Sequence, residues 1–402
     1  MPEAVDLSGN FDMPPQDAVR YFRGKGYRIS RDWTDVWGGG HARNFTVAKV
    51  AQIDLLTDIR RSLDQALANG ETFESWKARI IPTLVTKGWW GTVRDAKITG
   101  TGDAVVINPR RLKVIYDTNL RTARAAGQWA RIQAAKATRP YLRYSAVMDR
   151  RTRPQHRAWH STILPVDHPW WQTHFPPNGW FCRCNVQQLS ERDMKRLGYQ
   201  VSTVPPEGPP TKYVSKTGFT ADVPAGIDAG FGQNTGREGL AAIVERAARS
   251  MQNAVDAGLV PAARQALKEM LASPAVEQFL VDNQPGMPIA IIDDEVLTLL
   301  GGTQRVVTLS ARTLDKITQE KGRFYPADVY RAIQAGIDAP RLRILQANGN
   351  VLTVFEVSGK LYVSVIRALP TQGELWLSTL FRVNEDDLDR LRRTGQVQID
   401  AP

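Results

Sequence analysis

The spacing of the apolar residues changes near residue 287, and this change constrains the fold more than any other feature. Before it, apolar residues recur every three or four positions, as in 42–69 and 109–137, which is typical of amphipathic helices. After it, short apolar runs are separated by turn dipeptides such as Asn348-Gly349, which is typical of antiparallel strands. The sequence therefore predicts a multi-domain chain: a mainly α N-terminal domain with a small β and loop region around 141–184, then a C-terminal α+β domain with an antiparallel sheet.

Composition places the boundaries between these parts. We expect a first domain over 1–200 and a connector over 201–236, where Pro, Gly, Ser and Thr are frequent. A helical segment should follow over 237–284, and the α+β domain should occupy 285–402. The strands of that last domain are expected over 288–292, 305–309, 341–346, 352–357, 361–366 and 374–381.

The net charge of +11 lies entirely in 1–284, because the Lys and Arg residues of 285–402 equal its Asp and Glu residues in number. Excess positive charge favours a polyanionic partner through counterion release, although a well-solvated basic surface gives the same composition. No apolar stretch is long enough to span a bilayer, and the polar N-terminus lacks the apolar region of a secretory signal. Two cysteines cannot form a disulfide framework, which fits a reducing compartment.

Four of the five histidines and both cysteines lie between His156 and Cys184. His156 and His160 are four residues apart, so a helix would place them on one face, and Cys182-x-Cys184 brings two sulfur atoms close together. Two imidazoles and two thiolates form a ligand set that suits tetrahedral Zn²⁺. Two alternatives stay open: the side chains pack and hydrogen bond without a metal, or the thiols have a redox role.

The same segment contains the block Pro176-Pro177-Asn178-Gly179-Trp180-x-Cys182-Arg183-Cys184. With this block as its most specific part, the segment resembles the phage Mu F-like minor head, or head morphogenesis, proteins. Blocks in the same order cover about residues 14–200. They include Asp17-Ala18-x-x-Tyr21-Phe22-Arg23, Phe45-Thr46-Val47-Ala48-Lys49, Lys87-Gly88-Trp89-Trp90-Gly91, Tyr116-x-Thr118-Asn119, Arg139-Pro140-Tyr141, Arg153-Pro154-x-His156 and Asp167-x-Pro169-Trp170.

This resemblance implies a minor capsid protein of a tailed bacteriophage. It implies several copies per virion, located in the capsid interior or at the portal vertex and assembled in the host cytoplasm. It also implies a role in procapsid assembly and in DNA packaging or ejection. The implied partners are the portal, the major capsid or scaffold proteins, and phage DNA bound without sequence specificity.

Residues 285–402 extend beyond the basic form of that family. In layout they resemble phage-borne nuclease domains related to barnase and colicin-type RNases, which polymorphic toxins carry as C-terminal effectors. This second resemblance implies a metal-independent RNase that cleaves host RNA, and such a reaction needs a base and an acid. Since no histidine follows His174, other side chains would have to supply them. The candidates are Lys316, Glu320, Lys321, Arg323, Arg343, Ser378, Thr379 and Arg382.

The alternative for 285–402 is an inactive or purely interacting domain. In that case Lys316–Arg323 is a solvated helix end, and Ser378 and Thr379 are ordinary strand residues. The zero net charge of this part favours the alternative, because RNA-binding domains usually carry excess positive charge.

Overall fold

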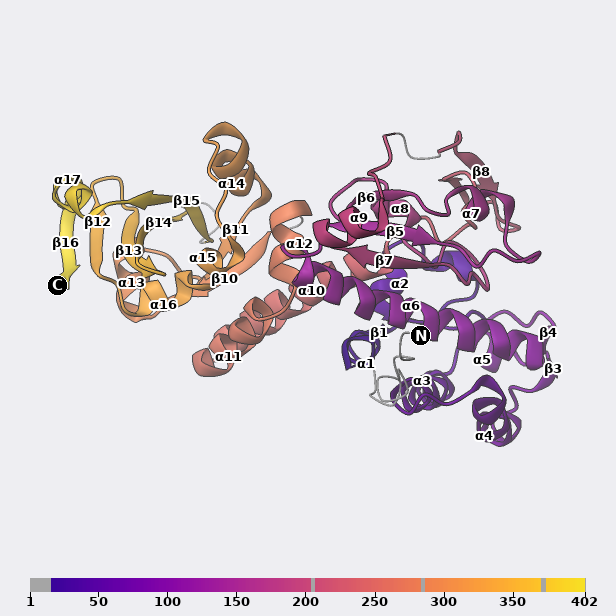
Figure 1. Cartoon of the computed structure of the whole chain (residues 1–402). Coiled ribbons are helices and arrows are strands. Elements are labelled where there is room, and N and C mark those ends of the chain that lie inside the picture. The colour runs from indigo at the N-terminus through magenta and orange to yellow at the C-terminus, as the bar shows by residue number, and fades with distance from the viewer. Residues whose placement is uncertain (1–15, 204–206, 283–285, 370–373, 402) are drawn as a thin grey trace. The chain divides into compact units, whose positions relative to one another are not determined.

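The computed structural model describes residues 16–203, 207–282, 286–369 and 374–401 (Figure 1). The chain divides into two compact units, Met1–Gly239 and Leu240–Pro402. The first unit is mainly helical and the second contains a large sheet, which confirms the expected fold class. Among the described residues, no helix combines the length and the apolar character that crossing a membrane requires.

Four helices form the core of the first unit. Each buries an apolar face in one cluster, which is the main source of their stability. The longest of them begins where the Asn108 side chain accepts a hydrogen bond from the backbone N–H of Arg111, with Pro109 in the first turn. The four helices are α1 (Gln16–Arg23), α3 (Ile53–Ala68), α4 (Phe73–Thr86) and α6 (Pro109–Ala135).

Helices α1 and α6 cross at Ala18 and Gly127. A Cβ atom at Gly127 would lie only 2.7 Å from the backbone nitrogen of Ala18, so a larger residue would push the helices apart. Small residues at 123, 126 and 127 therefore permit the close packing that α6 makes within this unit.

The helix expected over 42–69 begins only at Ile53. Upstream of it, β2 (Asn44–Phe45) pairs in parallel with β1 (Gly26–Tyr27), and Lys49 adopts a left-handed backbone conformation with φ +62°. Such a residue interrupts a helix, so the apolar residues Phe45, Val47 and Val50 reach the core from a strand and a turn.

Short strands and helices complete the first unit. The β and loop region expected around 141–184 contains a three-stranded sheet in the order β6-β5-β7. The strands are β3 (Gly91–Val93), β4 (Val105–Ile107), β5 (Tyr141–Ser145), β6 (Ile163–Pro165), β7 (Asn185–Leu189), β8 (Thr211–Val214) and β9 (Thr220–Val223). The helices are η2 (Trp33–Asp35), α2 (Gly40–Arg43), α5 (Ala96–Thr99), α7 (Pro154–Ala158), α8 (Trp171–His174) and α9 (Glu191–Leu197).

The segment 201–236, expected to be an extended connector, belongs to the first unit. It forms the β8–β9 hairpin. The loop after the hairpin contacts other parts of the first unit. The carboxylate of Asp228 accepts a hydrogen bond from Arg153, and the Asn234 side chain donates to the carbonyl oxygen of Trp171. This loop therefore helps to build the Cys and His region.

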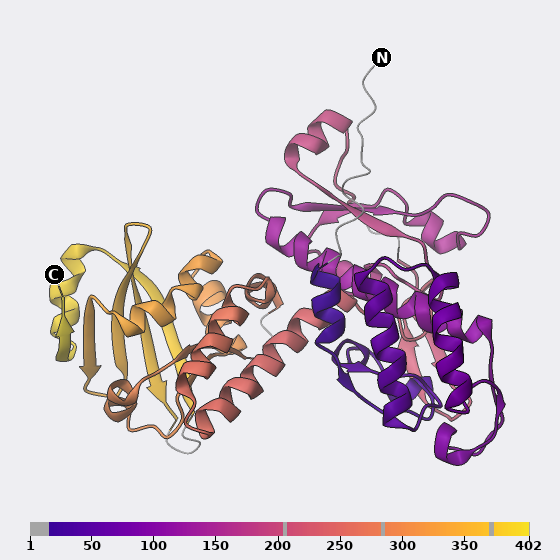
Figure 2. The ribbon, with the colours of Figure 1, turned by 90° about the horizontal axis from the view of Figure 1, so that it is seen from below.

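The second unit is built around a seven-stranded sheet in the order β10-β11-β15-β14-β13-β12-β16, antiparallel except where β11 and β15 run parallel. Figure 2 shows these strands side by side, in orange to yellow. Six of the seven lie close to the expected positions. They are β10 (Met287–Ile291), β11 (Val306–Leu309), β12 (Leu342–Gln346), β13 (Val351–Val357), β14 (Lys360–Ala368), β15 (Leu375–Val383) and β16 (Gly395–Asp400).

Helices cover both faces of this sheet. On one face, Leu388 and Leu391 pack with Ile344 and Val363. On the other face, α16 lies so close to β13 that a Cβ atom at Gly336 would come within 2.4 Å of the Phe355 ring. The helices of this unit are α10 (Thr235–Asp256, which begins in the first unit), α11 (Val260–Leu271), α12 (Ala275–Asp282), α13 (Asp294–Leu300), α14 (Ala311–Asp315), the π-helix η3 (Lys316–Glu320), α15 (Ala327–Arg331), α16 (Ile333–Asp338), η4 (Glu385–Asp387) and α17 (Leu388–Arg392).

Candidate functional site

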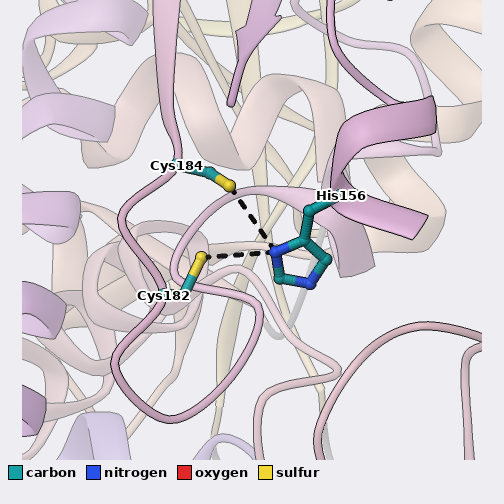
Figure 3. A group of neighbouring side chains, drawn as sticks. All are labelled: His156, Cys182 and Cys184. Atoms are coloured by element: carbon teal, nitrogen blue, oxygen red, sulfur yellow. Dashed lines mark hydrogen bonds between the residues drawn. The ribbon is translucent and has the colours of Figure 1, made fainter. Parts of the chain in front are cut away.

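One histidine and both cysteines meet in the first unit. His156 lies on α7, and Cys182 and Cys184 lie on the turn that leads into β7. Their ligand atoms all lie within 4.8 Å of one another. Nδ1 of His156 is 3.7 Å from Sγ of Cys182 and 3.5 Å from Sγ of Cys184. Figure 3 shows this nitrogen facing both sulfur atoms. We call these three residues the Cys/His group.

The imidazole of His156 has a defined orientation. Its other nitrogen, Nε2, lies 3.0 Å from the carbonyl oxygen of Gly226. A carbonyl oxygen only accepts hydrogen bonds, so Nε2 carries the proton and Nδ1 presents its lone pair to the sulfur atoms. The ring also stacks on Trp159, with ring centroids 4.9 Å apart. Both contacts hold the lone pair in place.

The two thiols are strongly coupled. The hydrogen bond with Cys184 lowers the pKa of the Cys182 thiol to about 4, against the opposing effect of burial. The same hydrogen bond, together with burial, raises the pKa of Cys184. The shared hydrogen bond thus makes the thiol of Cys182 more acidic and that of Cys184 less acidic.

Two arginines beside the group are each paired with a carboxylate. Arg183, between the two cysteines, binds both carboxylate oxygens of Asp149 at 2.8 and 2.6 Å. Arg153 donates to Asp228 at 2.6 Å. These pairs fix the ends of the loop segments that carry the group, and bidentate pairing gives the first of them a defined geometry.

Buried aromatic and amide side chains surround the group. The hydroxyl of Tyr144, on β5, donates to Oδ1 of Asn178 at 2.9 Å, and burial raises the pKa of this tyrosine. Trp170 stacks on His174, whose pKa burial lowers to about 4. These contacts make the segment a rigid aromatic core, and they involve the residues that carry the family resemblance.

His160, expected to join His156 as a ligand, lies outside the Cys/His group. Helix α7 ends at Ala158, so the two histidines do not share a helical face. Nδ1 of His160 instead accepts a hydrogen bond from the backbone N–H of Ala146 at 3.2 Å.

The residues that sequence reasoning missed are Gly226 and Asp228. Both follow the β8–β9 hairpin, some 70 residues after the side chains that they contact. The only local signal was the Pro224-Ala225-Gly226 turn within a segment that resembled a connector.

A cavity of about 290 Å³ lies elsewhere in the first unit. Its lining includes Lys25, His41 and Trp180. Burial lowers the pKa of Lys25 to about 7 and that of His41 to about 4. Two side chains of the cavity wall are thus less basic than usual, which sequence patterns did not indicate.

The candidate catalytic residues of the second unit fall in two places. Residues 316–323 lie beside β15, where the Arg323 guanidinium stands over the ring of Phe381 at 5.6 Å. Ser378, Thr379 and Arg382 are on β15 itself, where Thr379 and Arg382, three residues apart, point to opposite faces of the sheet. Lys321 and Arg382 are exposed and Lys316 is partly buried, while the side chain of Glu320 lies outside the described residues.

Arg343 lies apart from that region. It is on β12, which β13 and β14 separate from β15. Its side chain is only 2% exposed, donates to the carbonyl oxygen of Ile337 at 2.6 Å and lies 3.1 Å from Glu295. These contacts give Arg343 a place in the core of the second unit.

The structure defines a modular protein in which a helical unit with a buried Cys/His group precedes an α+β unit. Residues 57–187 match the model of the family described as phage Mu protein F like protein. The first unit is therefore similar to proteins of the phage Mu F-like family. No solved structure matches the chain.

Two relatives show the extent of the similarity. The putative capsid assembly protein F of Escherichia phage Mu is 41% identical over 232 residues, which cover 58% of this chain and 51% of that protein. The Mu-like prophage FluMu F protein of Haemophilus influenzae is 40% identical over 176 residues, or 44% of this chain and 42% of that protein. The chain thus spans about half the length of the curated relatives it matches.

Proposed function

We propose that this chain acts in assembly of the head of a Mu-like phage and is a minor component of the virion. The similarity to the capsid assembly protein F of phage Mu carries this proposal, because it extends over 232 residues. The buried Cys/His group and its paired arginines support a structural role, since they link distant segments of the chain.

We further propose that the protein lies in the capsid interior at or near the portal vertex, in several copies, and takes part in DNA packaging or ejection. Its partners there would be portal, major capsid or scaffold proteins. Excess positive charge in 1–284 supports contact with DNA, because basic side chains release counterions from the phosphate backbone without reading sequence.

An amber codon in place of Trp33, in a phage that carries this gene, tests the head-assembly role. In a non-suppressing host we expect particles without filled heads, and a suppressor strain should restore them. Mass spectrometry of purified virions should find peptides of this chain. Filled heads at normal titre, together with virions that lack the chain, would contradict the proposal.

DNA contact is tested separately with the purified full chain. We expect it to bind unrelated duplexes with equal affinity, and the affinity should fall steeply with salt concentration. Absence of binding at low salt would remove DNA from the proposed partners without affecting the assembly role.

A second candidate function belongs to the second unit: an RNase effector that acts on host RNA. One observation favours it, namely that the segment with Lys316 and Arg323 lies beside β15, the strand that carries Arg382. Lysine and arginine side chains suit a phosphate backbone, and a lysine or a carboxylate would have to serve as base. Arg343 lies in the core and does not add to these residues.

Expression of the full chain and of 240–402 in a bacterium tests the RNase function. We expect growth arrest and RNA loss, relieved by Lys321→Ala or Arg382→Ala and retained in the exposed control Arg390→Ala. Normal growth with intact RNA, at expression levels confirmed by immunoblot, would leave the second unit with an interaction role only.

A further inference from the structure

We propose that His156, Cys182 and Cys184 bind one Zn²⁺ ion, which joins α7 to the turn before β7. Cys182 is buried and His156 is only 2% exposed, while Cys184 is partly buried, so protein would surround most of the ion. This goes beyond the proposed role in head assembly and does not depend on it.

The distances within the Cys/His group match those around zinc. With Zn–S about 2.3 Å and Zn–N about 2.1 Å, a tetrahedral ion holds a nitrogen and a sulfur ligand about 3.6 Å apart. The two observed separations from Nδ1 of His156 are 3.7 Å and 3.5 Å. Two sulfur ligands would be about 3.8 Å apart, and all three ligand atoms already lie within 4.8 Å of one another. The ion therefore needs only a small adjustment of side chains.

The histidine is oriented as zinc ligands usually are. Metal-binding histidines commonly donate their second N–H to a carbonyl or carboxylate, which fixes the tautomer that exposes a lone pair to the metal. Nε2 of His156 donates in this way to the carbonyl oxygen of Gly226. This hydrogen bond leaves the lone pair of Nδ1 directed at the two sulfur atoms.

The charges around the Cys/His group favour a dication as the partner of the two thiolates, rather than the side chain of a nearby arginine. Arg183 and Arg153, which lie beside the sulfur atoms, are already paired with Asp149 and Asp228. A Zn²⁺ ion would neutralise two thiolates, so the enclosed group would carry no net charge. The two arginine pairs would then act as the outer layer that orients the loops holding the ligands.

Three protein ligands leave one position of the tetrahedron. Among the described parts of the chain, no other Cys, His, Asp or Glu joins the group. We therefore assign the fourth position to a water molecule. His160, which the sequence pattern offered as the fourth ligand, accepts a backbone hydrogen bond from Ala146 instead.

Metal analysis of the full chain, purified in chelator-treated buffer, tests the site. We expect about one zinc ion per chain, measured by inductively coupled plasma mass spectrometry. Cys182→Ser and Cys184→Ser should each lower that ratio at least fivefold, whereas the matched control His160→Gln should keep it. Cobalt substitution should give the intense near-ultraviolet bands of cobalt–thiolate bonds, and these should weaken in either cysteine variant.

A measurement on the wild-type protein keeps the test of the zinc site valid if a cysteine variant fails to fold. A mercurial that blocks thiols should release zinc to a coloured indicator, and removal of zinc should lower the thermal midpoint by roughly 5 °C. The proposal is overturned by a folded wild-type chain with almost no zinc and two freely titrating thiols. A mass two daltons lower, which indicates a Cys182–Cys184 disulfide, overturns it too, as does zinc that persists in both cysteine variants.

Discussion

Arg183 donates two hydrogen bonds, of 2.8 and 2.6 Å, to the carboxylate of Asp149 and thereby joins the two ends of the segment that carries the Cys/His group. The guanidinium comes from the residue between the two cysteines, while the carboxylate precedes α7. This hydrogen-bonded pair holds the pKa of the Asp149 carboxyl well below its usual range. The pair therefore stabilises the fold only while Asp149 is charged.

Asp149→Asn should lower the urea midpoint of the first unit at neutral pH. Because the folded-state pKa is depressed, the stabilisation is fully present above the unfolded-state pKa of 3.8 and is lost as pH falls below it. The difference between wild type and variant should thus stay constant from pH 7 to pH 5 and shrink below about pH 4. In the control Asp103→Asn, a 74% exposed carboxylate that pairs with Lys49, the loss should be smaller. A difference that grows in acid would show that the pair does not act as described.

Gly226→Ala tests the fit between the hairpin loop and α7. Gly226 has φ +78°, and a Cβ atom there would lie 2.6 Å from Cβ of Gln155. We expect a loss of about 2–4 kcal/mol in unfolding free energy, from strain plus displacement of α7. The control is Gly218→Ala, which has φ +83° but open space around the new atom, so it should cost only about 1 kcal/mol. Equal losses in denaturant titrations of the two variants would remove the steric explanation.

Helix and strand positions followed well from local patterns. The helix expected over 109–137 appears as α6, because Asn108 and Pro109 mark its start and a continuous apolar face follows. The strand β16 (Gly395–Asp400) was not predicted from the sequence. It lies at the edge of the sheet, and its residues, such as Gln396 and Gln398, are largely polar and only partly buried. Its pairing with β12 depends on a long-range contact that no local pattern encodes.

The Cys/His group was only partly predictable from the sequence. His156, Cys182 and Cys184 were singled out by residue type and spacing, and the fold brings them together. His160 was added because four-residue spacing suits a helix, but α7 is too short for that rule to apply. Gly226 could not be found, because its contribution is a backbone carbonyl that the hairpin places 70 residues from its partner.

Because Lys25 is buried, the unfolding free energy of the protein should depend on pH above neutrality. Its side chain is 7% exposed, and among the described residues no carboxylate pairs with it; the ammonium instead faces the ring of Tyr21. Desolvation lowers its pKa to about 7, so the folded state binds fewer protons than the unfolded state between that pH and 10.5. Unfolding free energy should therefore rise with pH in this window, by at most about 1.4 kcal/mol per pH unit.

Lys25→Met should remove that slope and raise stability at pH 7, since the folded state no longer buries an ammonium group. The exposed control Lys97→Met should leave the slope unchanged. Chemical denaturation at pH 7, 8 and 9 measures the effect. A variant that keeps the wild-type slope would place the titrating group elsewhere.

Thr353→Val should stabilise the second unit. Thr353 is 1% exposed on β13 and pairs across the sheet with Arg343 on one side and Ser364 on the other. Its hydroxyl has no hydrogen-bond partner among the described residues, and valine has nearly the same shape without an unsatisfied polar group. We expect a gain of about 1 kcal/mol in unfolding free energy, read as a higher urea midpoint at an unchanged slope. The control Thr298→Val, at a hydroxyl that donates to the carbonyl oxygen of Asp294 on α13, should give no gain. A lower urea midpoint for Thr353→Val would contradict the view that this hydroxyl is buried without a hydrogen-bond partner.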